Sequence, residues 1–258
     1  EPDTATRTEL HWERFDAAGD NTYFSTVILE NLVSDDLVGP HLTVDQTDNS
    51  AWVSWEWLQT SGADVRITKL SETGTVLVSE QTIAWNSTAT SVPHDSALLT
   101  DGDLVVVSEE GGDLVISGVS SAGVQTFAPI TLTSSAPSDA RVVGLANGGF
   151  VVSFENDFEN GNVLFQVFDN LGVAQDIARS VGFGSDVQGD ASIVALPDGD
   201  FVIFWYEGVL NDPLSNTLVA RRIKPDSNPD GSQFTVDTFG REPDVGVTAD
   251  GRIVFTWE

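Results

Sequence analysis

Short apolar runs alternate with turn residues along the whole chain. Residues 192–196 and 201–205, for example, are rich in Val, Ile, Phe and Trp, and Asp198-Gly199 stands between them. Two such runs around an Asp-Gly or Asn-Gly dipeptide are typical of a β-hairpin, because Gly and Asn tolerate the positive φ that tight turns need. No helical period competes with this pattern, so we expect an all-β protein.

This hairpin recurs through the chain, and a second hairpin follows each copy. The first set of turns is Asp48-Asn49, Asp101-Gly102, Asn147-Gly148, Asp198-Gly199 and Asp250-Gly251. The second set lies at residues 15–19, 70–74, 119–123, 168–172 and 223–231, and each of these segments ends in Gly. Each unit is therefore a meander of four strands, A to D, in about 50 residues, which is the size of a propeller blade.

A glutamate marks the end of strand B in every unit. The pairs are Trp55-Glu56, Ser108-Glu109, Phe154-Glu155, Tyr206-Glu207 and Trp257-Glu258, at intervals of 46 to 53 residues. At the termini, residues 241–258 supply strands A and B only, and residues 5–32 supply strands C and D only. Pairing residues 253–257 with residues 10–14 would complete a fifth blade and cover two open sheet edges.

The sequence thus predicts one all-β domain, residues 1–258, that forms a five-bladed β-propeller of four-stranded blades. The predicted blades are approximately residues 38–83, 91–133, 137–181, 187–238, and 241–258 plus 5–32. The ring would be closed by pairing of the N- and C-terminal half-blades. A linear β-solenoid, or a fragment of a longer array, is the alternative.

The composition is strongly acidic and lacks cysteine. There are 40 Asp and Glu against 11 Lys and Arg, for a formal charge of −29. Nucleic acid and anionic lipid bind to basic surfaces, so neither is an expected partner. The absence of cysteine excludes disulfides and a thiol nucleophile. No apolar run is long enough for a membrane span, and the chain starts with Glu1 rather than Met, which indicates a processed chain or an excised domain.

Two segments resemble a repeat of large secreted bacterial proteins. Residues 140–154 read ARVVGLANGGFVVSF, and residues 191–205 read ASIVALPDGDFVIFW. They are similar to the propeller-type Asp-Gly/Trp repeats of surface proteins that often also carry RTX-type calcium-binding nonapeptides. This resemblance implies an extracellular or cell-surface module for binding or adhesion. The chain contains no Gly-Gly-x-Gly-x-Asp nonapeptide, so the RTX calcium roll itself is not expected.

Acidic residues should gather at one end of the blades, because strand A starts beside the end of its antiparallel neighbour, strand B. Strand A starts with Asp95, Asp139, Asp190 or Asp244, and with His41 in the remaining unit; strand B ends with Glu109, Glu155 or Glu207, and with Glu56 and Glu258 in the outer units. Crowded carboxylates attract cations, and hard oxygen ligands favour Ca²⁺. We therefore expect calcium at Asp95, Asp139, Asp190, Asp244, Glu109, Glu155 and Glu207, with further acids in the loop of Asp157 and Glu159. The alternative is that these side chains cap backbone N–H groups of their own or the next blade.

The aromatic residues divide into core and surface candidates. Trp55, Trp205 and Trp257 occupy equivalent positions, and we expect them to be buried between blades. A carbohydrate or cell-surface ligand needs an exposed aromatic platform with polar neighbours. The candidate ligand-binding residues are Trp57, Trp85, Tyr206 and His41.

An enzyme is the second interpretation. The chain has none of the common serine-hydrolase, zinc-peptidase or P-loop motifs. Five-bladed glycosidases place carboxylates at the starts of inner strands, and Glu242-Pro243-Asp244 is similar in outline to that arrangement. Catalysis by such a glycoside hydrolase or polysaccharide lyase needs acids with separated pKa values. A deep pocket with an Arg, a Tyr and two inequivalent acids would favour the enzyme, and near-equal blades favour binding or a structural spacer in a large surface protein.

Overall fold

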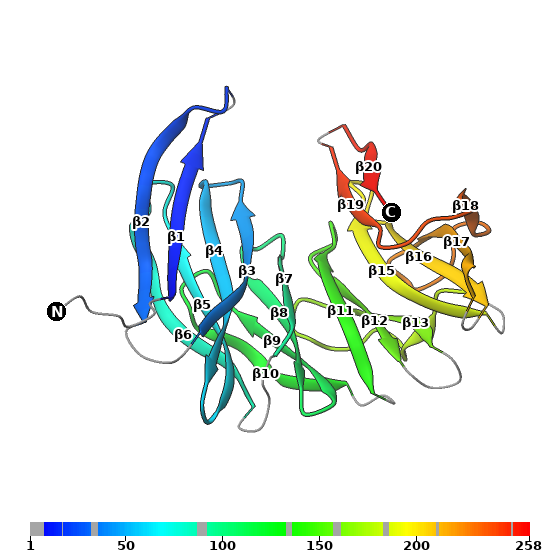
Figure 1. Cartoon of the computed structure of the whole chain (residues 1–258), viewed down its shortest axis with the longest axis horizontal. Helices are drawn as coiled ribbons and strands as arrows, with labels where there is room; N and C mark the ends of the chain where they lie inside the picture. Colours follow the sequence, from blue (N-terminus) through cyan, green and yellow to red (C-terminus); the bar gives the residue numbers. More distant parts are fainter. Residues whose placement is uncertain are drawn as a thin grey trace. The chain divides into compact units, whose positions relative to one another are not determined.

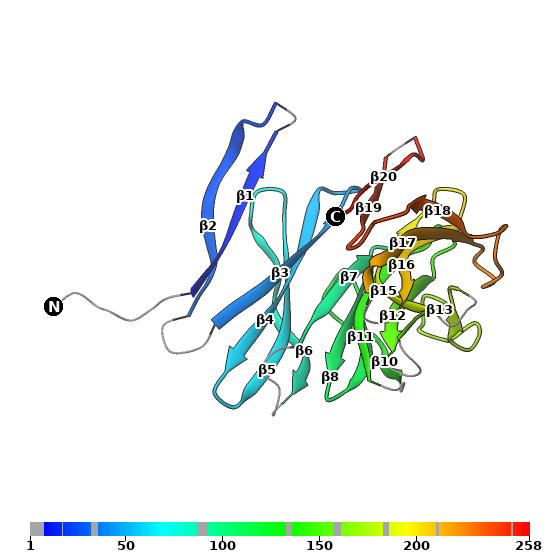
Figure 2. The same ribbon diagram turned by 45° about the vertical axis from the view of Figure 1, so that its right-hand side comes forward.

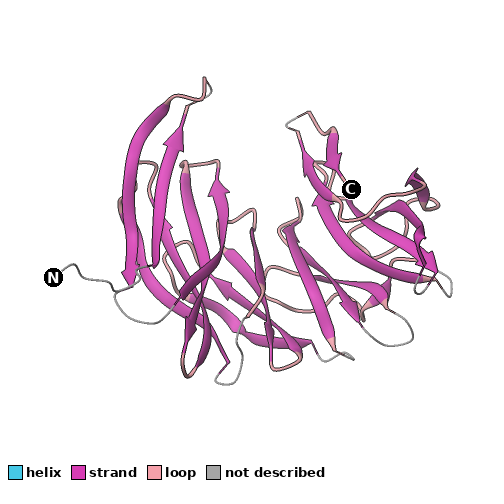
Figure 3. Ribbon diagram, in the orientation of Figure 1, coloured by secondary structure: helices cyan, strands magenta, loops and turns pink. Residues whose placement is uncertain are grey.

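The computed structural model describes residues 8–16, 18–31, 36–86, 92–132, 136–156, 161–182, 186–209, 212–248 and 250–258. Its regular structure consists of strands joined by loops (Figure 3). Among these residues there is no helix of the length and hydropathy that a membrane span requires. The chain divides into two compact units, residues 1–93 and 94–258, and each is described by itself.

Unit 1 contains a hairpin and a four-stranded antiparallel sheet (Figure 1). The hairpin is formed by β1 (Thr8–Phe15) and β2 (Asn21–Asn31). The sheet has the order β3 (Asp36–Asp45), β4 (Ser50–Gln59), β5 (Gly62–Leu70) and β6 (Val76–Asn86). Leu10 and Trp12 of the hairpin pack against Val53, Trp55 and Leu70 of the sheet, so the hairpin covers one face of it.

Unit 2 contains three four-stranded antiparallel sheets and one hairpin. The first sheet is β7 (His94–Leu98), β8 (Leu104–Glu110), β9 (Asp113–Val119) and β10 (Gln125–Leu132). The second is β11 (Pro137–Gly144), β12 (Phe150–Asn156), β13 (Asn162–Phe168) and β14 (Arg179–Ser180). The third is β15 (Val187–Ala195), β16 (Phe201–Val209), β17 (Asp212–Ile223) and β18 (Phe234–Asp237). The hairpin is β19 (Asp244–Val247) and β20 (Ile253–Thr256), which lies beside β15 (Figure 1, Figure 2).

Apolar layers join successive sheets of unit 2. One layer, between the first two sheets, contains Val107, Ile116 and Phe150. The next layer, between the second and third sheets, contains Phe165 and Trp205. Strand B of each of these sheets is buried at five consecutive positions, so its residues face both layers: Val151 of β12 lies in one layer, and Phe150 and Val152 lie in the other. This face-to-face succession is the packing of propeller blades.

The predicted turns are confirmed. The second residue of each strand A–B turn has a positive φ: Asn49 55°, Gly102 86°, Gly148 93°, Gly199 98° and Gly251 81°. In one of them, the Gly148 N–H donates to the Leu145 carbonyl and the Leu145 N–H to the Gly149 carbonyl, which closes a tight turn with a glycine bulge. The four full sheets begin and end within a few residues of the predicted blades. The single domain and the blade count stay predictions.

The terminal hairpins differ from the full sheets. β1 pairs with β2, and β19 with β20, each as a two-stranded sheet, so closure of a fifth blade also stays a prediction. Trp205 is fully buried as predicted, but Trp257 is 42% exposed, and its predicted burial is wrong. A two-stranded sheet offers this indole no neighbouring strand C; instead its Nε1 donates to Asp237 Oδ2 at 3.0 Å.

Candidate functional site

Strand A of the two central blades of unit 2 begins with a β-bulge. The pairing of β11 with β12 shifts between Ser138 and Arg141, and that of β15 with β16 shifts between Gly189 and Ser192. The bulges hold Asp139 and Asp190 in the left-handed conformation, with φ of 48° and 50°. Just before β19, Glu242 has a φ of 49°. A left-handed residue in such a bend turns successive N–H groups to the same side and so forms an anion-binding nest.

Glutamates at the ends of strand B fill these nests. Glu155 accepts hydrogen bonds from the N–H groups of Asp190 and Ala191 in the next blade. Glu109 accepts from the equivalent N–H groups of Asp139 and Ala140. These bonds are the backbone pairing that the sequence analysis gives as the alternative to a metal role.

The glutamate of unit 1 makes a bond of the same kind. Glu56 Oε2 accepts from the Val92 N–H at 2.8 Å. A carboxylate at the end of strand B thus reaches the start of the next repeat in both units.

The strand register corrects the alignment of the fourth blade. Glu155 pairs with Ser138, the residue before one bulge Asp, and Tyr206 pairs with Gly189, the residue before the other. Tyr206, and not Glu207, therefore occupies the position of the repeated glutamate. Successive strand residues face opposite ways, so Glu207 points to the other side.

Glu207 has a separate set of partners. It accepts hydrogen bonds from Trp205 Nε1 at 3.1 Å and from Gln233 Nε2 at 3.0 Å. Because Tyr206 has no carboxylate to place in the following nest, Asp190 accepts from the Glu242 N–H instead. The repeat is broken at this point.

The register also separates the predicted strand A acids into two sets. Asp139 and Asp190 lie in bulges. Asp95 and Asp244 occupy a different position of strand A, two residues after the bulge position, which Arg141 occupies in the second sheet. His41 of unit 1 shares this later position. The Asp95 carboxylate accepts from the Val142 N–H at 2.9 Å and from the Ser96 N–H at 2.8 Å, which makes it a backbone cap.

The starts of β11, β15 and β19 surround a pocket of about 340 Å³, here named the carboxylate pocket. Its lining residues are Asp139, Arg141, Asp190, Ala191, Ser192, Glu242, Pro243 and Asp244. Three predicted metal ligands, Asp139, Asp190 and Asp244, thus come together with an additional acid, Glu242, and with an arginine that the sequence analysis did not single out.

Tyr206 and Arg241 stand beside this pocket. The Arg241 guanidinium lies 5.0 Å from the centre of the Tyr206 ring, and its Nε lies 3.7 Å from Asp190 Oδ2. A Cβ at Gly189 would lie 2.9 Å from the Tyr206 ring. Glycine is therefore needed at this position if the ring is to lie against strand A.

The acids around the pocket are electrostatically inequivalent. Burial raises the pKa of Glu155 to about 7, and the charges of Asp139 and Asp190 add to this effect. Burial also raises the pKa of Asp190, which nearby Arg241 opposes. The pKa of Glu109 is raised by burial as well.

The remaining predicted ligand-binding residues belong to unit 1. One face of the Trp57 ring is covered by the Arg66 guanidinium, 3.5 Å from the ring centre, so that face does not offer a stacking platform. His41 is exposed on β3. The side chain of Trp85 lies outside the described residues, as does the loop of Asp157 and Glu159.

Calcium binding stays a prediction. Within the described parts of the chain, no three His, Asp or Glu side chains are grouped so that they could hold a metal ion together. A cation at the carboxylate pocket would therefore have fewer than three preformed carboxylate or imidazole ligands from the described residues.

Comparisons with known proteins support the fold. No protein-family model matches the sequence, and no curated protein does. Among solved structures, a protein of unknown function from Dyadobacter fermentans is similar with a TM-score of 0.59 and 11% identity, covering 86% of this chain and 74% of that one. The structure described as the Dos1 propeller has a TM-score of 0.54 and 10% identity over 93% of this chain and 58% of that one. NanB has a TM-score of 0.55 and 9% identity over 87% and 53%. The chain is thus an all-β, propeller-type module of four-stranded antiparallel sheets.

Proposed function

We propose that the chain is an extracellular binding module whose carboxylate pocket takes a neutral carbohydrate. The observation that carries the proposal is the break in the repeat at Tyr206. The equivalent Glu56, Glu109 and Glu155 bond to the start of the next repeat, whereas here an aromatic ring and Arg241 stand beside a polar pocket. A position freed from its structural role is available for a ligand.

The chemistry of the pocket favours a polyhydroxyl ligand. Carboxylates of Asp139, Asp190 and Asp244 can accept hydrogen bonds from sugar hydroxyls, and Arg141 can donate to them. The face of Tyr206 offers an apolar surface for the C–H side of a sugar ring. The acids that line this pocket outnumber its one arginine, which disfavours an anionic ligand over a neutral one there.

A glycan array followed by calorimetry tests this proposal. We expect a neutral oligosaccharide to bind the parent protein and both Asp190→Asn and Tyr206→Ala to weaken that binding at least about tenfold, which is the loss of one or two good contacts. Asp198→Asn is the matched control, because it changes an aspartate at the opposite end of the same hairpin. Binding that is equally strong in all three variants would place the ligand elsewhere.

A glycoside hydrolase or polysaccharide lyase is the second candidate, because one specific observation favours it. Burial raises the pKa of Glu155 to about 7, which suits a general acid, and Asp139 and Asp190 lie near it as further carboxylates of the kind that such chemistry uses. This is the inequivalence of acids, next to an Arg and a Tyr, that the sequence analysis named as favouring an enzyme.

Incubation with a panel of polysaccharides separates the two candidates. Release of new reducing or unsaturated ends that Glu155→Gln abolishes would establish the enzyme. Binding without any product would leave the chain as a binding or adhesion module. The chain contains no cysteine, so thiol oxidation does not affect either assay.

We also propose that the two terminal hairpins complete a fifth blade. Each hairpin supports this by packing on the blade predicted to adjoin it: Trp12 of β1 on the sheet of Trp55, and Phe255 of β20 on the sheet of Phe204. Deletion of residues 1–32 should then cause aggregation or loss of cooperative unfolding, because β20 would keep an open edge. A monomeric truncated protein with unchanged melting would contradict closure.

A further inference from the structure

A second cavity, of about 330 Å³, lies between the second and third sheets of unit 2 and differs in chemistry from the carboxylate pocket. It is formed by β13, β14, β17 and the loop that follows β17, and we name it the arginine pocket. Its apolar wall consists of Phe165, Val181, Ile223 and Pro229. Val181 and Ile223 are buried in the core between the two sheets, so this wall is fixed by packing.

Two arginines, Arg179 and Arg221, line the same cavity. Arg221 is 6% exposed, and its Nη1 donates to the Val181 carbonyl at 2.5 Å. Arg179 is half-buried; its Nη1 donates to the Ser227 carbonyl at 3.4 Å, and its Nη2 bonds the Asp176 carboxylate. These bonds hold both groups in place, so that little rotamer entropy is lost when they meet a ligand.

The charge around this cavity is unusual for the protein. Only 11 of 258 residues are Lys or Arg, yet two of them line this one pocket, and its lining, all of it within the described residues, includes no carboxylate. Asp176 and Glu207 lie outside the lining; Glu207 acts on Arg221 at longer range, where Gln233 bridges the two. Burial lowers the pKa of Arg221, which Glu207 opposes, so the guanidinium still carries its charge near neutral pH.

We propose that the arginine pocket binds a small carboxylate with an apolar body. A guanidinium fork matches the two oxygens of a carboxylate, and an apolar wall excludes the water that would otherwise weaken this pair. The same wall disfavours phosphate, which keeps a tight hydration shell, and a sugar, which would leave hydroxyls without partners. A monocarboxylate on an aromatic ring or a short aliphatic chain satisfies both halves of the cavity, whose volume is in the range of small-molecule sites.

Benzoate is the probe, and its uncharged isostere benzamide is the control ligand. Binding is measured by calorimetry and by ¹H–¹⁵N shifts of the labelled protein at constant ionic strength. We expect benzoate to bind, with shifts at Val181 and Ser227, and benzamide to bind at least about tenfold more weakly, since it lacks the charge that pairs with arginine. Equal affinity for the two compounds would overturn the proposal, as would absence of benzoate binding at millimolar concentration.

Arginine variants locate the site. Arg179→Gln and Arg221→Gln should each reduce benzoate affinity about tenfold. Arg222→Gln is the matched control, because Arg222 is the next residue on β17, faces the other way and pairs with Asp198 and Asp200. If Arg221→Gln does not fold, the Arg179→Gln variant alone tests the proposal, because Arg179 is only half-buried. Unchanged affinity in Arg179→Gln, or an equal loss in Arg222→Gln, would show that benzoate binds elsewhere and overturn the proposal.

Discussion

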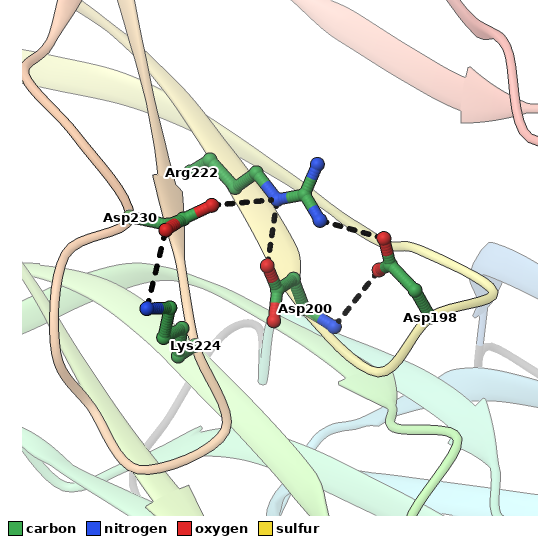
Figure 4. Close-up of polar contacts among 5 residues, drawn as sticks. All are labelled: Asp198, Asp200, Arg222, Lys224 and Asp230. Atoms are coloured by element: carbon green, nitrogen blue, oxygen red, sulfur yellow. Dashed lines mark hydrogen bonds and ion pairs between the residues drawn. The ribbon is translucent and has the colours of Figure 1, made fainter.

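The two ends of the β15–β16 hairpin carry the same kind of side chain and use it differently. At the turn end, Arg222 pairs with Asp198 and Asp200 at 2.6 Å each, and Lys224 pairs with Asp230 at 3.2 Å (Figure 4). Arg222 also reaches Asp230 at 3.5 Å. Three carboxylates thus share two cations, and this network ties the A–B turn to the loop after β17.

At the other end of the hairpin, burial dominates. Asp190 has Arg241 at 3.7 Å, while Glu155 has backbone N–H groups as its hydrogen-bond donors and the negative charge of Asp139 nearby. The pKa values of Asp190 and Glu155 are accordingly raised. The difference teaches that a close cation decides the state of an aspartate in this repeat. Asp198 and Asp200 have Arg222 at 2.6 Å and form an ion-pair network, whereas Asp190 has its cation at 3.7 Å and burial outweighs the attraction.

The largest expected effect concerns Trp205, on strand β16 of the same hairpin. Trp205 fills the core between the second and third sheets and donates to Glu207. Trp205→Ala should reduce the free energy of unfolding by about 3–5 kcal/mol, because it leaves a cavity in the core and removes one of the hydrogen bonds to Glu207. Trp257→Ala, at the equivalent but exposed position, should cost about 1 kcal/mol or less. Urea unfolding of both variants measures the two values, and equal losses would contradict the difference in burial.

The second effect separates the two ends directly. Arg222→Gln should destabilise the protein by about 2 kcal/mol, because the largely buried Asp200 loses a charged hydrogen bond. Arg241→Gln should change the free energy of unfolding by less than about 0.5 kcal/mol, because Arg241 is exposed and its distance to Asp190 is long. Thermal and urea unfolding at one ionic strength compare them. A greater loss in Arg241→Gln would reverse the assignment of the two ends.

The third effect is a pH dependence at the strand end. The folded-state pKa of Glu155, about 7, lies above the unfolded value of 4.5, so the folded protein holds this proton more tightly. The stability that Glu155 contributes is complete below about pH 4.5 and is lost as the pH rises to about 7. Glu155→Gln should therefore lose less stability over this window than the parent, by about 1–2 kcal/mol after allowance for partial solvent exposure.

A control of opposite sign accompanies that measurement. The pKa of Asp176 is lowered, by the Ile177 N–H first and then by Arg179. Its contribution to stability is present above the unfolded pKa of 3.8 and is lost on acidification. Asp176→Asn should thus be less stable than the parent at neutral pH and equal to it in acid.

Parallel pH profiles for the parent and Glu155→Gln would show that Glu155 ionises normally and would contradict the third prediction.

The smallest expected effect is that of calcium. With fewer than three preformed carboxylate or imidazole ligands among the described residues, calcium at the carboxylate pocket should bind weakly. At about four to five times its Kd, in the millimolar range, it should raise the free energy of unfolding by about 1 kcal/mol. Melting in CaCl₂ is compared with melting in NaCl at matched ionic strength, for the parent and for Asp190→Asn. Equal melting temperatures in the two salts would reject a calcium site; a rise that Asp190→Asn removes would establish it.

The strands and turns could be predicted from the sequence, because turn chemistry and apolar alternation are local. Asp198-Gly199 predicts its hairpin without any knowledge of the neighbouring blades. The register could not be predicted by matching glutamates. Counting from the turn aligns Tyr206 with Glu155, whereas matching residue type aligns Glu207, and a slip of one residue moves a side chain to the other face.

The role of the candidate site stays a prediction, but part of its arrangement follows from the strand pattern. That pattern brings Asp139 and Asp190 together, and they line one pocket, whereas it does not single out Arg141 and Arg241. The sequence does contain a sign of them. Basic residues are few in this chain, yet Arg141 stands two positions from Asp139 and Arg241 stands next to Glu242. Which of them would reach the pocket depends on the bulge geometry, a property of the strand pairing rather than of any single segment.

The hydrogen bond from a strand B glutamate to the next bulge affects how repeats can be added to such a chain. The second sheet of unit 2 carries both halves of this connection: the carboxylate of Glu155, which reaches the next sheet, and the bulge at Asp139, which receives Glu109 of the preceding one. A duplicated repeat would therefore arrive with compatible joints on both sides and require no new contact. The number of blades can then change by copying, and one substituted joint, as at Tyr206, is enough to give a uniform array a single distinct position.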